Sequence, residues 1–362
     1  MKKLSKNAKS NAVTYAIVIV FYIVMQILSG SGTLSSSLTG QLIPICVYIC
    51  MAVSLNLTVG ILGELSLGHA GFMSVGAFTG VIVAMSLQAS VASGPIRLVL
   101  AMVVGAVMAA IVGVLVGVPV LRLRGDYLAI VTLAFGEIIK NILNNLYVAY
   151  DAEGLHIRLL TAISKSELAE GGFMIINGPQ GATGITKLST FTAGFLLMLF
   201  TLFVVLNLIQ SRSGRAIMSI RDNRIAAESV GINVTKYKLM AFVVSAALAG
   251  MAGALYAMNF TGVAAKKFDF NTSILVLVFV VLGGMGNIRG SIIAAAILYV
   301  LPELLRAVND YRMLFYAIVL IVVMLVTNNP TLKNGVNAVW TALKGVFVKT
   351  VPVPEEGGES DE

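Results

Sequence analysis

The chain is poor in charged residues, since only 12% of its 362 residues are Asp, Glu, Lys or Arg while 58% are hydrophobic. Soluble globular proteins have about 25% charged and about 45–50% apolar residues. A soluble domain of this length could not bury so much apolar surface, so the excess is expected to face lipid. The net charge of +8 comes from lysines and arginines in short loops between apolar runs, which argues against a nucleic-acid partner.

The residues of familiar catalytic and metal sites are also scarce. The chain has no Gly-Lys pair and therefore no Walker A motif, so we do not expect it to hydrolyse ATP by that route. Its two cysteines, Cys46 and Cys50, lie one helical turn apart in an apolar run, which favours buried free thiols over a zinc site or a disulfide. With only two histidines and no evident nucleophile–base pair, we predict no enzyme, no metal site and no bound cofactor.

Long apolar runs are what the chain does contain. Crossing about 30 Å of hydrocarbon takes roughly 17–25 helical residues. Runs of that kind cover residues 12–28, 42–61, 66–88, 97–120, 127–149, 190–210, 238–258, 270–286, 289–306 and 311–328. Because these runs are continuous rather than alternating, they indicate helices and not a barrel. We predict an all-α, polytopic transmembrane helical bundle of about ten spans, with a possible helix break at Gly283–Gly286.

The first run needs separate treatment because Lys2, Lys3, Lys6 and Lys9 precede it, as in secretory signal peptides. The apolar stretch Val13–Leu28 is longer than a usual signal-peptide core, and no A-x-A cleavage site follows it. This favours an uncleaved first span over a cleaved signal.

The distribution of lysine and arginine predicts the orientation, because cytoplasmic loops are enriched in both. We expect residues 1–11 in the cytoplasm and residues 12–328 as the transmembrane domain. The loop 150–189 would lie outside, and the Arg-rich loop 211–237 and the tail 329–362 inside, the tail being disordered at its end. Lys266 and Lys267 are an exception, since the same count places them outside.

Small residues recur at helical spacing within the runs. Gly76 and Gly80 are four residues apart, as are Gly113 and Gly117, and residues 246–254 are almost all small. Such faces let helix backbones approach closely in lipid. They predict a tightly packed bundle.

The segment Gly214–Gly231 is too polar to cross the membrane. Its apolar residues Ile217, Ile220, Ile225 and Val230 can share one side of a short helix or helix pair. An amphipathic helix lying on anionic lipid is the commoner use of such a segment and is favoured by physics alone. A docking helix for a cytosolic partner is the alternative.

Charges at bilayer depth usually face a cavity or a partner. Glu64 and His69 flank Ser66 in a Gly/Ser-rich stretch that is consistent with a helix break. These residues either line the solute path or form a buried hydrogen-bonded pair that fixes the break, and both interpretations stay open. Asn56 and Thr132 are further path candidates, although for both, and for Asn141, hydrogen bonds between helices are the commoner use.

Two other ionisable positions have simpler interpretations. Glu137 precedes Lys140 by three residues, so an ion pair within one helix is expected. His156, in the loop 150–189, is expected to be solvated.

Several separated blocks of sequence stand out together. They are Leu55–Leu57 with GILGELSLGHAGFMSVGAF (60–78), RLRGDYLAIVTLAFGEIIKNILNN (122–145), GPQGATGI (178–185), SGRAIMSIRDNRIAAESVGINVTKYKLMAFVVSAALAGMAGALYA (213–257) and LGGMGNIRGSIIAAAIL (282–298). The chain resembles, in these blocks, the permease subunits of bacterial branched-chain amino acid ABC importers, and particularly the M-type of the two permeases. The resemblance runs from about Leu42 to Pro330.

The resemblance implies that Gly214–Gly231 is the loop that docks into the ATPase. ABC importers in general carry Glu-Ala-Ala followed three residues later by Gly at this place; Ala226, Ala227 and Gly231 match, whereas Ile225 stands where the general motif has Glu. The implied coupling residues are Gly214, Arg215, Arg221, Arg224, Ala226, Ala227 and Gly231. The implied partners are a second homologous permease, cytosolic ATPases that use ATP, and an extracytoplasmic solute-binding protein.

The function implied by the resemblance is a translocation path for branched-chain amino acids. Related permeases for urea or another small solute are an alternative. A secondary transporter driven by an ion gradient is another, because such transporters often carry carboxylates at the membrane midplane, as Glu64 and Glu137 would be.

Overall fold

The computed structural model describes residues 6–32, 35–123, 125–163, 168, 172–305, 311, 314, 317–321 and 325. The predicted span 311–328, apart from isolated positions, and the whole predicted tail 329–362 lie outside these residues. The chain divides into two compact units, Met1–Glu303 and Leu304–Glu362, and the description below concerns the first.

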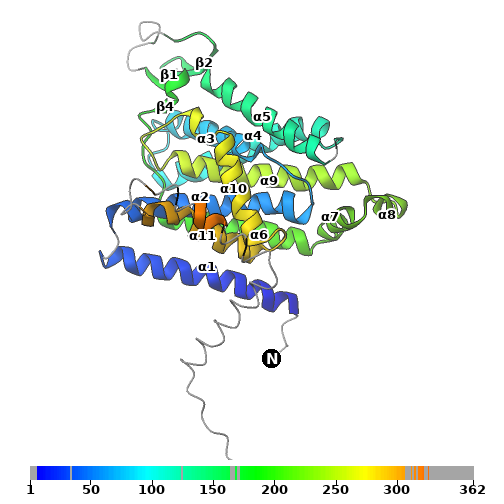
Figure 1. Ribbon diagram of the computed structural model, residues 1–362. Helices are drawn as coiled ribbons and strands as arrows, with labels where there is room; N and C mark the ends of the chain where they lie inside the picture. The colour runs from blue at the N-terminus through cyan, green and yellow to red at the C-terminus, as the bar shows by residue number, and fades with distance from the viewer. Residues whose placement is uncertain are drawn as a thin grey trace, which may run out of the picture. The chain divides into compact units, whose positions relative to one another are not determined.

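The first unit is mostly helical and carries one small sheet (Figure 1). Its long helices are α1 (Lys6–Gly30), α2 (Ser36–Asn56), α3 (His69–Ser86), α4 (Gly94–Val120), α5 (Asp126–Asn144), α6 (Phe191–Gln210), α9 (Val234–Ala257), α10 (Phe270–Gly283) and α11 (Ile288–Leu304). Short helices are η1 (Leu57–Ile61), η3 (Gly178–Gln180), α7 (Arg212–Asp222), α8 (Arg224–Ser229) and η4 (Ala265–Lys267). The strands are β1 (Leu146–Asp151), β2 (Gly154–Leu159), β3 (Phe173–Asn177), β4 (Ala182–Thr183) and β5 (Gly262–Val263).

Seven helices in the described part of the chain are long and apolar enough to cross a membrane, and they correspond to the first seven predicted spans. The predicted span 127–149 is too long at its end, because β1 begins at Leu146. The predicted spans 270–286 and 289–306 are α10, which at 14 residues is shorter than a full span, and α11, which at 17 residues is at the lower limit.

The all-α prediction is incomplete, because a five-stranded antiparallel sheet with the order β2-β1-β3-β4-β5 forms mainly from the loop 150–189. Asp151 closes the hairpin between β1 and β2, since its Oδ1 accepts hydrogen bonds from the backbone N of Glu153 at 2.9 Å and of Gly154 at 3.2 Å. His156 Nε2 lies 2.9 Å from the same oxygen. The prediction that His156 is only solvated is therefore wrong.

Small residues allow α3, α4 and α9 to pack with their backbones in contact. A Cβ at Gly76 would overlap the backbone of Gly250, and one at Gly253 would overlap the carbonyl of Met73. A Cβ at Gly113 of α4 would lie 2.9 Å from the Cβ of Ala246 of α9, so these helices also pack closely. The predicted tight bundle is confirmed, and close backbone approach is the expected source of helix association in lipid.

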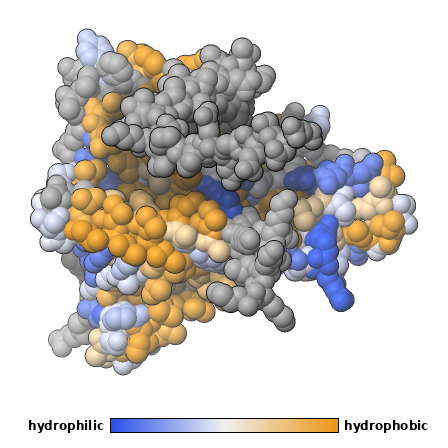
Figure 2. Space-filling view, turned by 90° about the horizontal axis from the view of Figure 1, so that it is seen from below, coloured by the Kyte–Doolittle hydropathy of each residue, from blue (hydrophilic) through white to orange (hydrophobic). Residues whose placement is uncertain are grey.

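Many large apolar side chains of α1, α4 and α6 are exposed, and the face of the molecule seen in Figure 2 is largely apolar (orange). The helix α1 is the least buried span, with only 11% of its apolar window inside the structure. It contacts α6 through Tyr22, whose ring stacks on those of Phe191 and Phe195 at centroid distances of 5.1 and 4.0 Å. Arg289 Nε also donates to Thr14 Oγ1 at 2.8 Å.

Two interruptions divide the helices inside the bundle, as the sequence predicts. After α2 the chain continues as the π-helical η1, leaves the helix at Leu62 and re-enters one at His69. Between α10 and α11 it turns through Gly284 and Gly286, whose φ angles of 91° and 80° favour glycine. Single π-helical turns inside α-helices are frequent at functional sites.

Asn56 joins the two interruptions. Its Oδ1 accepts a hydrogen bond from the backbone N of Gly286, and its Nδ2 donates to Ser291 Oγ, both at 2.8 Å. A Cβ at Gly60 would overlap the backbone of Gly286, so the two backbones are in direct contact.

Candidate coupling segment and solute path

The segment after α6 folds as a pair of short helices, α7 and α8, at the opposite end of the bundle from β4 (Figure 1). Ser211 Oγ caps α7 by accepting from Gly214 N at 3.1 Å, and Asn223 Oδ1 caps α8 by accepting from Ala226 N at 3.0 Å. Asn223 has an extended backbone with φ −156°, so α8 starts in a new direction.

Because of this change of direction, the apolar residues of the segment do not share one side, contrary to the prediction from the sequence. Ile217 and Ile220 of α7 are buried, as is Ala227 of α8. Ile225 and Val230, however, are 80% and 74% exposed. The inner side attaches the segment to the bundle, and the outer side presents apolar side chains among the hydrophilic residues at this end (Figure 2).

Two glycines of the segment are required by geometry. A Cβ at Gly214 would overlap the carbonyl oxygens of Leu208 and Ile209, which end α6. Gly231 follows α8 with φ +84°, a conformation that other residues rarely adopt. Gly214 and Gly231 therefore shape the turns that enter and leave the helix pair.

The three predicted coupling arginines have different partners. Arg215 Nη1 donates to the carbonyl of Gln210 at 3.2 Å, and Arg224 Nε pairs with Glu228 Oε1 at 2.9 Å. Arg221 pairs with Asp222 at 2.8 Å, but its Nη1 also donates to the carbonyl of Gly60 at 3.2 Å. Arg221 thus links the helix pair to η1.

A cavity of about 550 Å³ lies between the helix pair and the interruption after η1. Glu64 and Lys238 line it and form an ion pair, with side-chain exposures of 13% and 5%. Lys238 is absent from the predicted site residues. Its position at the start of the predicted span 238–258 is the signal that could have identified it, because a lysine there must find a partner or reach water.

The candidate path residues all lie around the interruption after η1, where most are hydrogen-bonded within the chain. His69 Nε2 lies 2.8 Å from Ser54 Oγ, and Glu64 pairs with Lys238. Of the two open interpretations, the Glu64–His69 hydrogen-bonded pair is therefore wrong, and the lining of a solute path stays a prediction. Thr132 Oγ1 accepts from Leu67 N at 3.1 Å, which ties α5 to the interruption. The helix-to-helix hydrogen bond considered for Asn56 is present, to Ser291 of α11, whereas in the described part of the chain Thr132 bonds to the non-helical Leu67 and not to another helix. The role of both residues in a solute path stays a prediction.

Ser66 differs from its neighbours, because its buried Oγ has no hydrogen-bond partner among the described residues. Farther along α5, the predicted ion pair between Glu137 and Lys140 is present. Asn141 bonds to the carbonyl of Glu137 at 2.9 Å, within its own helix rather than to another one.

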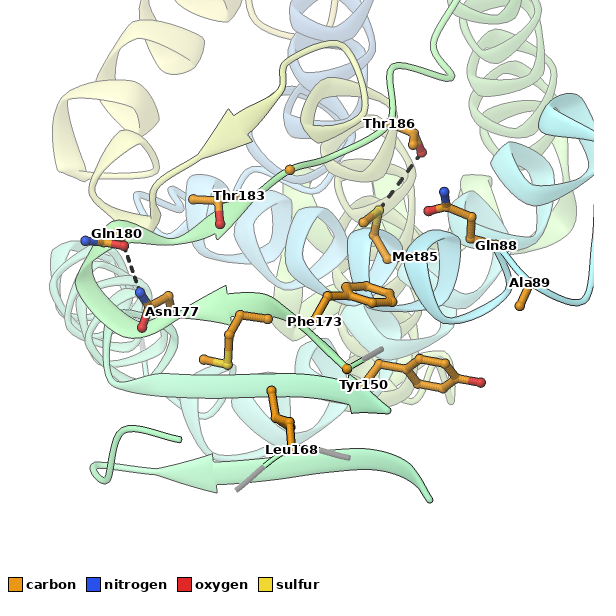
Figure 3. A pocket seen from close by; sticks show the side chains of 13 residues that line it. Met85, Gln88, Ala89, Tyr150, Leu168, Phe173, Asn177, Gln180, Thr183 and Thr186 are labelled. Carbon is orange, nitrogen blue, oxygen red and sulfur yellow. Dashed lines mark hydrogen bonds between the residues drawn. The ribbon is translucent and has the colours of Figure 1, made fainter. Parts of the chain in front are cut away.

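A second cavity of about 850 Å³ opens beside the sheet (Figure 3). Met85 and Gln88 of the α3 end face the strand residues Tyr150 and Phe173 across it. None of the described residues that line it is charged. A cavity of this kind suits uncharged groups rather than a carboxylate.

Comparisons with known proteins identify the family of the chain. The model of the family described as branched-chain amino acid transport system / permease component matches residues 37–324. The chain belongs to this family. The resemblance to permeases of branched-chain amino acid transport systems seen in the sequence is therefore confirmed, and the chain is a multi-pass membrane protein.

Among its relatives is the high-affinity branched-chain amino acid transport system permease protein LivM of Escherichia coli K12, 37% identical over 292 residues. LivM of Salmonella typhimurium is 36% identical over 287 residues. Each alignment covers 77% of this chain and 66% of the relative, so the chain spans just under two thirds of their length.

A second type of permease from the same systems is also similar. LivH of Escherichia coli K12 is 25% identical over 301 residues, covering 77% of this chain and 89% of LivH. No solved structure matches the chain.

Proposed function

We propose that this chain is the permease subunit of an ATP-binding-cassette importer and forms, with a second homologous permease, the path for branched-chain amino acids. The names of its LivM and LivH relatives support the solute class and the presence of two permease types. Cytosolic ATPases would use the ATP, an extracytoplasmic binding protein would deliver the solute, and this chain would bind no cofactor.

The observation that carries the proposal is the helix pair α7–α8. Ile225 and Val230 expose apolar side chains at one end of the bundle, while Arg221 of the same segment touches η1 inside it. A segment lying on lipid would need only the exposed face. A segment that transmits a movement needs both the exposed face and the inner contact.

The proposed orientation places α7–α8 and both chain termini in the cytoplasm and the loop 150–189 outside, in a bacterial cell membrane. The arginines of the helix pair support this orientation through the positive-inside rule. About ten spans remain the proposed number, with α10 and α11 crossing as a broken pair and residues 311–328 as the last span.

The proposed mechanism is a movement passed from the ATPases to the interrupted helices. The ATPases would hold Ile225 and Val230 and move α8 when they close on ATP. Arg221 would pass the movement to Gly60, and Asn56 would pass it to Gly286 between α10 and α11. For ATP to shift the permease between outward-open and inward-open states, the ATPases must bind α7–α8 with different free energies in the two states.

The first test is to purify the tagged chain from its native membrane in mild detergent and to identify accompanying proteins by mass spectrometry. We expect a second permease and ATPase subunits. Recovery of the chain alone, with uptake that is intact and sensitive to ionophores, would overturn the proposal in favour of a secondary transporter.

Two variants then distinguish docking of the ATPases on α7–α8 from transmission of the movement to the bundle. The double substitution Ile225→Glu with Val230→Glu is expected to remove the ATPases from the purified complex, because it places charges in an apolar contact. Arg221→Gln is expected to retain the ATPases but to abolish leucine uptake. Thr235→Glu is the matched control, since it adds an acid at an exposed position of α9 and should change neither result.

A further inference from the structure

The lysines Lys266 and Lys267 depart from the positive-inside pattern, and the structure places both beside a cavity. This cavity, of about 580 Å³, is lined by residues of α2, α9, α11 and the turn β5–η4, and it is separate from the two cavities described above. Its volume falls within the range of about 300–1,000 Å³ that is usual for small-molecule sites.

The lining of the cavity combines positive charge with aromatic surface. Lys266 and Lys267 line it together with Tyr256, Phe260 and Tyr299, and no acidic side chain is among the described residues that do so. Tyr299 donates a hydrogen bond to Gln41 Oε1 at 3.2 Å, which holds the α2 wall against the α11 wall.

The aromatic surface continues inward from the cavity. Tyr48 lies about two helical turns beyond Gln41 on α2. Its ring stacks on Tyr299 at 4.5 Å and meets Tyr256 edge-on at 6.3 Å. A solute in the cavity would therefore meet apolar rings on its inner side and ammonium groups on the side of η4.

The two lysines stand on a well-fixed turn, and their charges are not neutralised by the described residues. Ala265 and Phe268, on either side of the pair, are buried. Neither ammonium group forms an ion pair with a carboxylate in the described part of the chain.

The nearest acid in sequence, Asp269, is engaged elsewhere. Its carboxylate accepts hydrogen bonds from Thr272 N at 3.0 Å and Asn271 Nδ2 at 2.9 Å, at the start of α10. Burial raises the pKa of Asp269, but these hydrogen bonds outweigh burial and the net pKa is lowered. Asp269 therefore caps α10 as a carboxylate and leaves the lysines available to an external anion.

We propose that this cavity is an amino acid subsite of the permease, in which Lys266 and Lys267 bind the α-carboxylate and the Tyr256, Phe260 and Tyr299 rings contact the apolar side chain. The proposal rests on the proposed function and adds the residues that would contact the solute. On the proposed orientation the subsite faces outside, where a binding protein would release its solute.

Gly40 provides a direct test because it lines the cavity and a Cβ there meets no atom within 4 Å. The native Cys46 and Cys50 are buried free thiols and should not react. We would introduce Gly40→Cys in the full complex, reconstituted in nanodiscs of phosphatidylcholine alone, and measure its modification by a neutral maleimide. L-Leucine is expected to slow the modification, and L-leucinol, which lacks the carboxylate, is not.

Charge removal then tests the lysines. Adding Lys266→Gln and Lys267→Gln should raise the leucine concentration needed for half-protection by about tenfold or more, because charge-assisted hydrogen bonds to the carboxylate are lost. Lys187→Gln, which removes an exposed lysine from the loop before α6, should leave that concentration unchanged. Gly30→Cys, also free of neighbours within 4 Å, should show no protection at all.

Leucine uptake by the same reconstituted complex separates failure of this proposal from failure of the proposed function. Uptake without protection of the thiol introduced by Gly40→Cys, or protection that survives loss of both lysines, would overturn the subsite while the importer stands. Slowing of the modification by added phosphatidylglycerol but not by leucine would also overturn it, in favour of a lipid headgroup site. Absence of both uptake and protection would overturn the proposed function, and the subsite with it.

Discussion

The helices α2 and α4 show how differently two apolar spans can be used in one bundle. α4 is the more hydrophobic of the two, yet only 33% of its most apolar window is buried, whereas the α2–η1 span is 94% buried. The buried span carries Ser54, Asn56 and Thr58, and the exposed one is rich in valine and leucine. Hydrophobicity therefore marks contact with lipid, and small or polar residues mark the centre of the bundle, because water does not drive helices together inside a membrane.

The sharpest test of this difference is a larger side chain at the centre. Gly60→Val in η1 is expected to prevent formation of a folded protein, because even a Cβ there would overlap the backbone of Gly286. Overpacking usually costs about 1–3 kcal/mol and more where the backbone must move. The monodisperse peak in size-exclusion chromatography should disappear. Gly40→Val, at the open end of α2, should retain the peak, and a folded Gly60→Val protein would show that the contact yields easily.

An intermediate effect is expected when a polar side chain is removed from the centre of the bundle. Asn56→Ala leaves the part-buried N–H of Gly286 without its acceptor and the buried hydroxyl of Ser291 without its donor, which should lower the free energy of unfolding by about 1–3 kcal/mol. Unfolding in mixed micelles would measure it. Asn141→Ala is the control, because Asn141 is exposed and bonds only within α5, and equal effects of the two changes would contradict the assigned role of Asn56.

The smallest effect is expected on the lipid-facing side of α4. Leu115 is 66% exposed, so Leu115→Ala should change the free energy of unfolding by no more than about 0.5 kcal/mol. Unfolding in mixed micelles measures this free-energy change as well. Loss of more than about 2 kcal/mol would mean that a partner protein, rather than lipid, covers this side of α4.

Sequence reasoning located the long spans because length and continuity alone define them. The predicted run 97–120, for example, corresponds to α4 at Gly94–Val120. The predicted span 127–149 extends beyond the end of α5, because Leu146–Ala149 are apolar and such residues occur in strands as well as in helices. Apolar composition alone does not distinguish the two. The small-residue faces were also predictable, since the spacing of Gly76 and Gly80 is itself a packing signal.

The candidate site was less predictable because its contacts join distant parts of the chain. Glu64 pairs with Lys238, 174 positions away, and Arg221 reaches Gly60 over 161 positions. The periodicity of the sequence does not indicate which distant residues are in contact. The exposure of Ile225 was missed for a local reason, because Asn223 can either continue a helix or cap a new one, and here it caps α8.

The helix α1 lies outside the part of the chain that the family model matches. The family match begins at residue 37, after α1 has ended, and α1 reaches its neighbours mainly through the stacked ring of Tyr22 and the hydroxyl of Thr14. On the proposed orientation, its lysine-rich start decides which way the nascent chain enters the membrane. Insertion and transport would then belong to separate segments, and apolar substitutions in α1 should be tolerated as well as Leu115→Ala on the lipid-facing side of α4, unlike changes at the centre of the bundle.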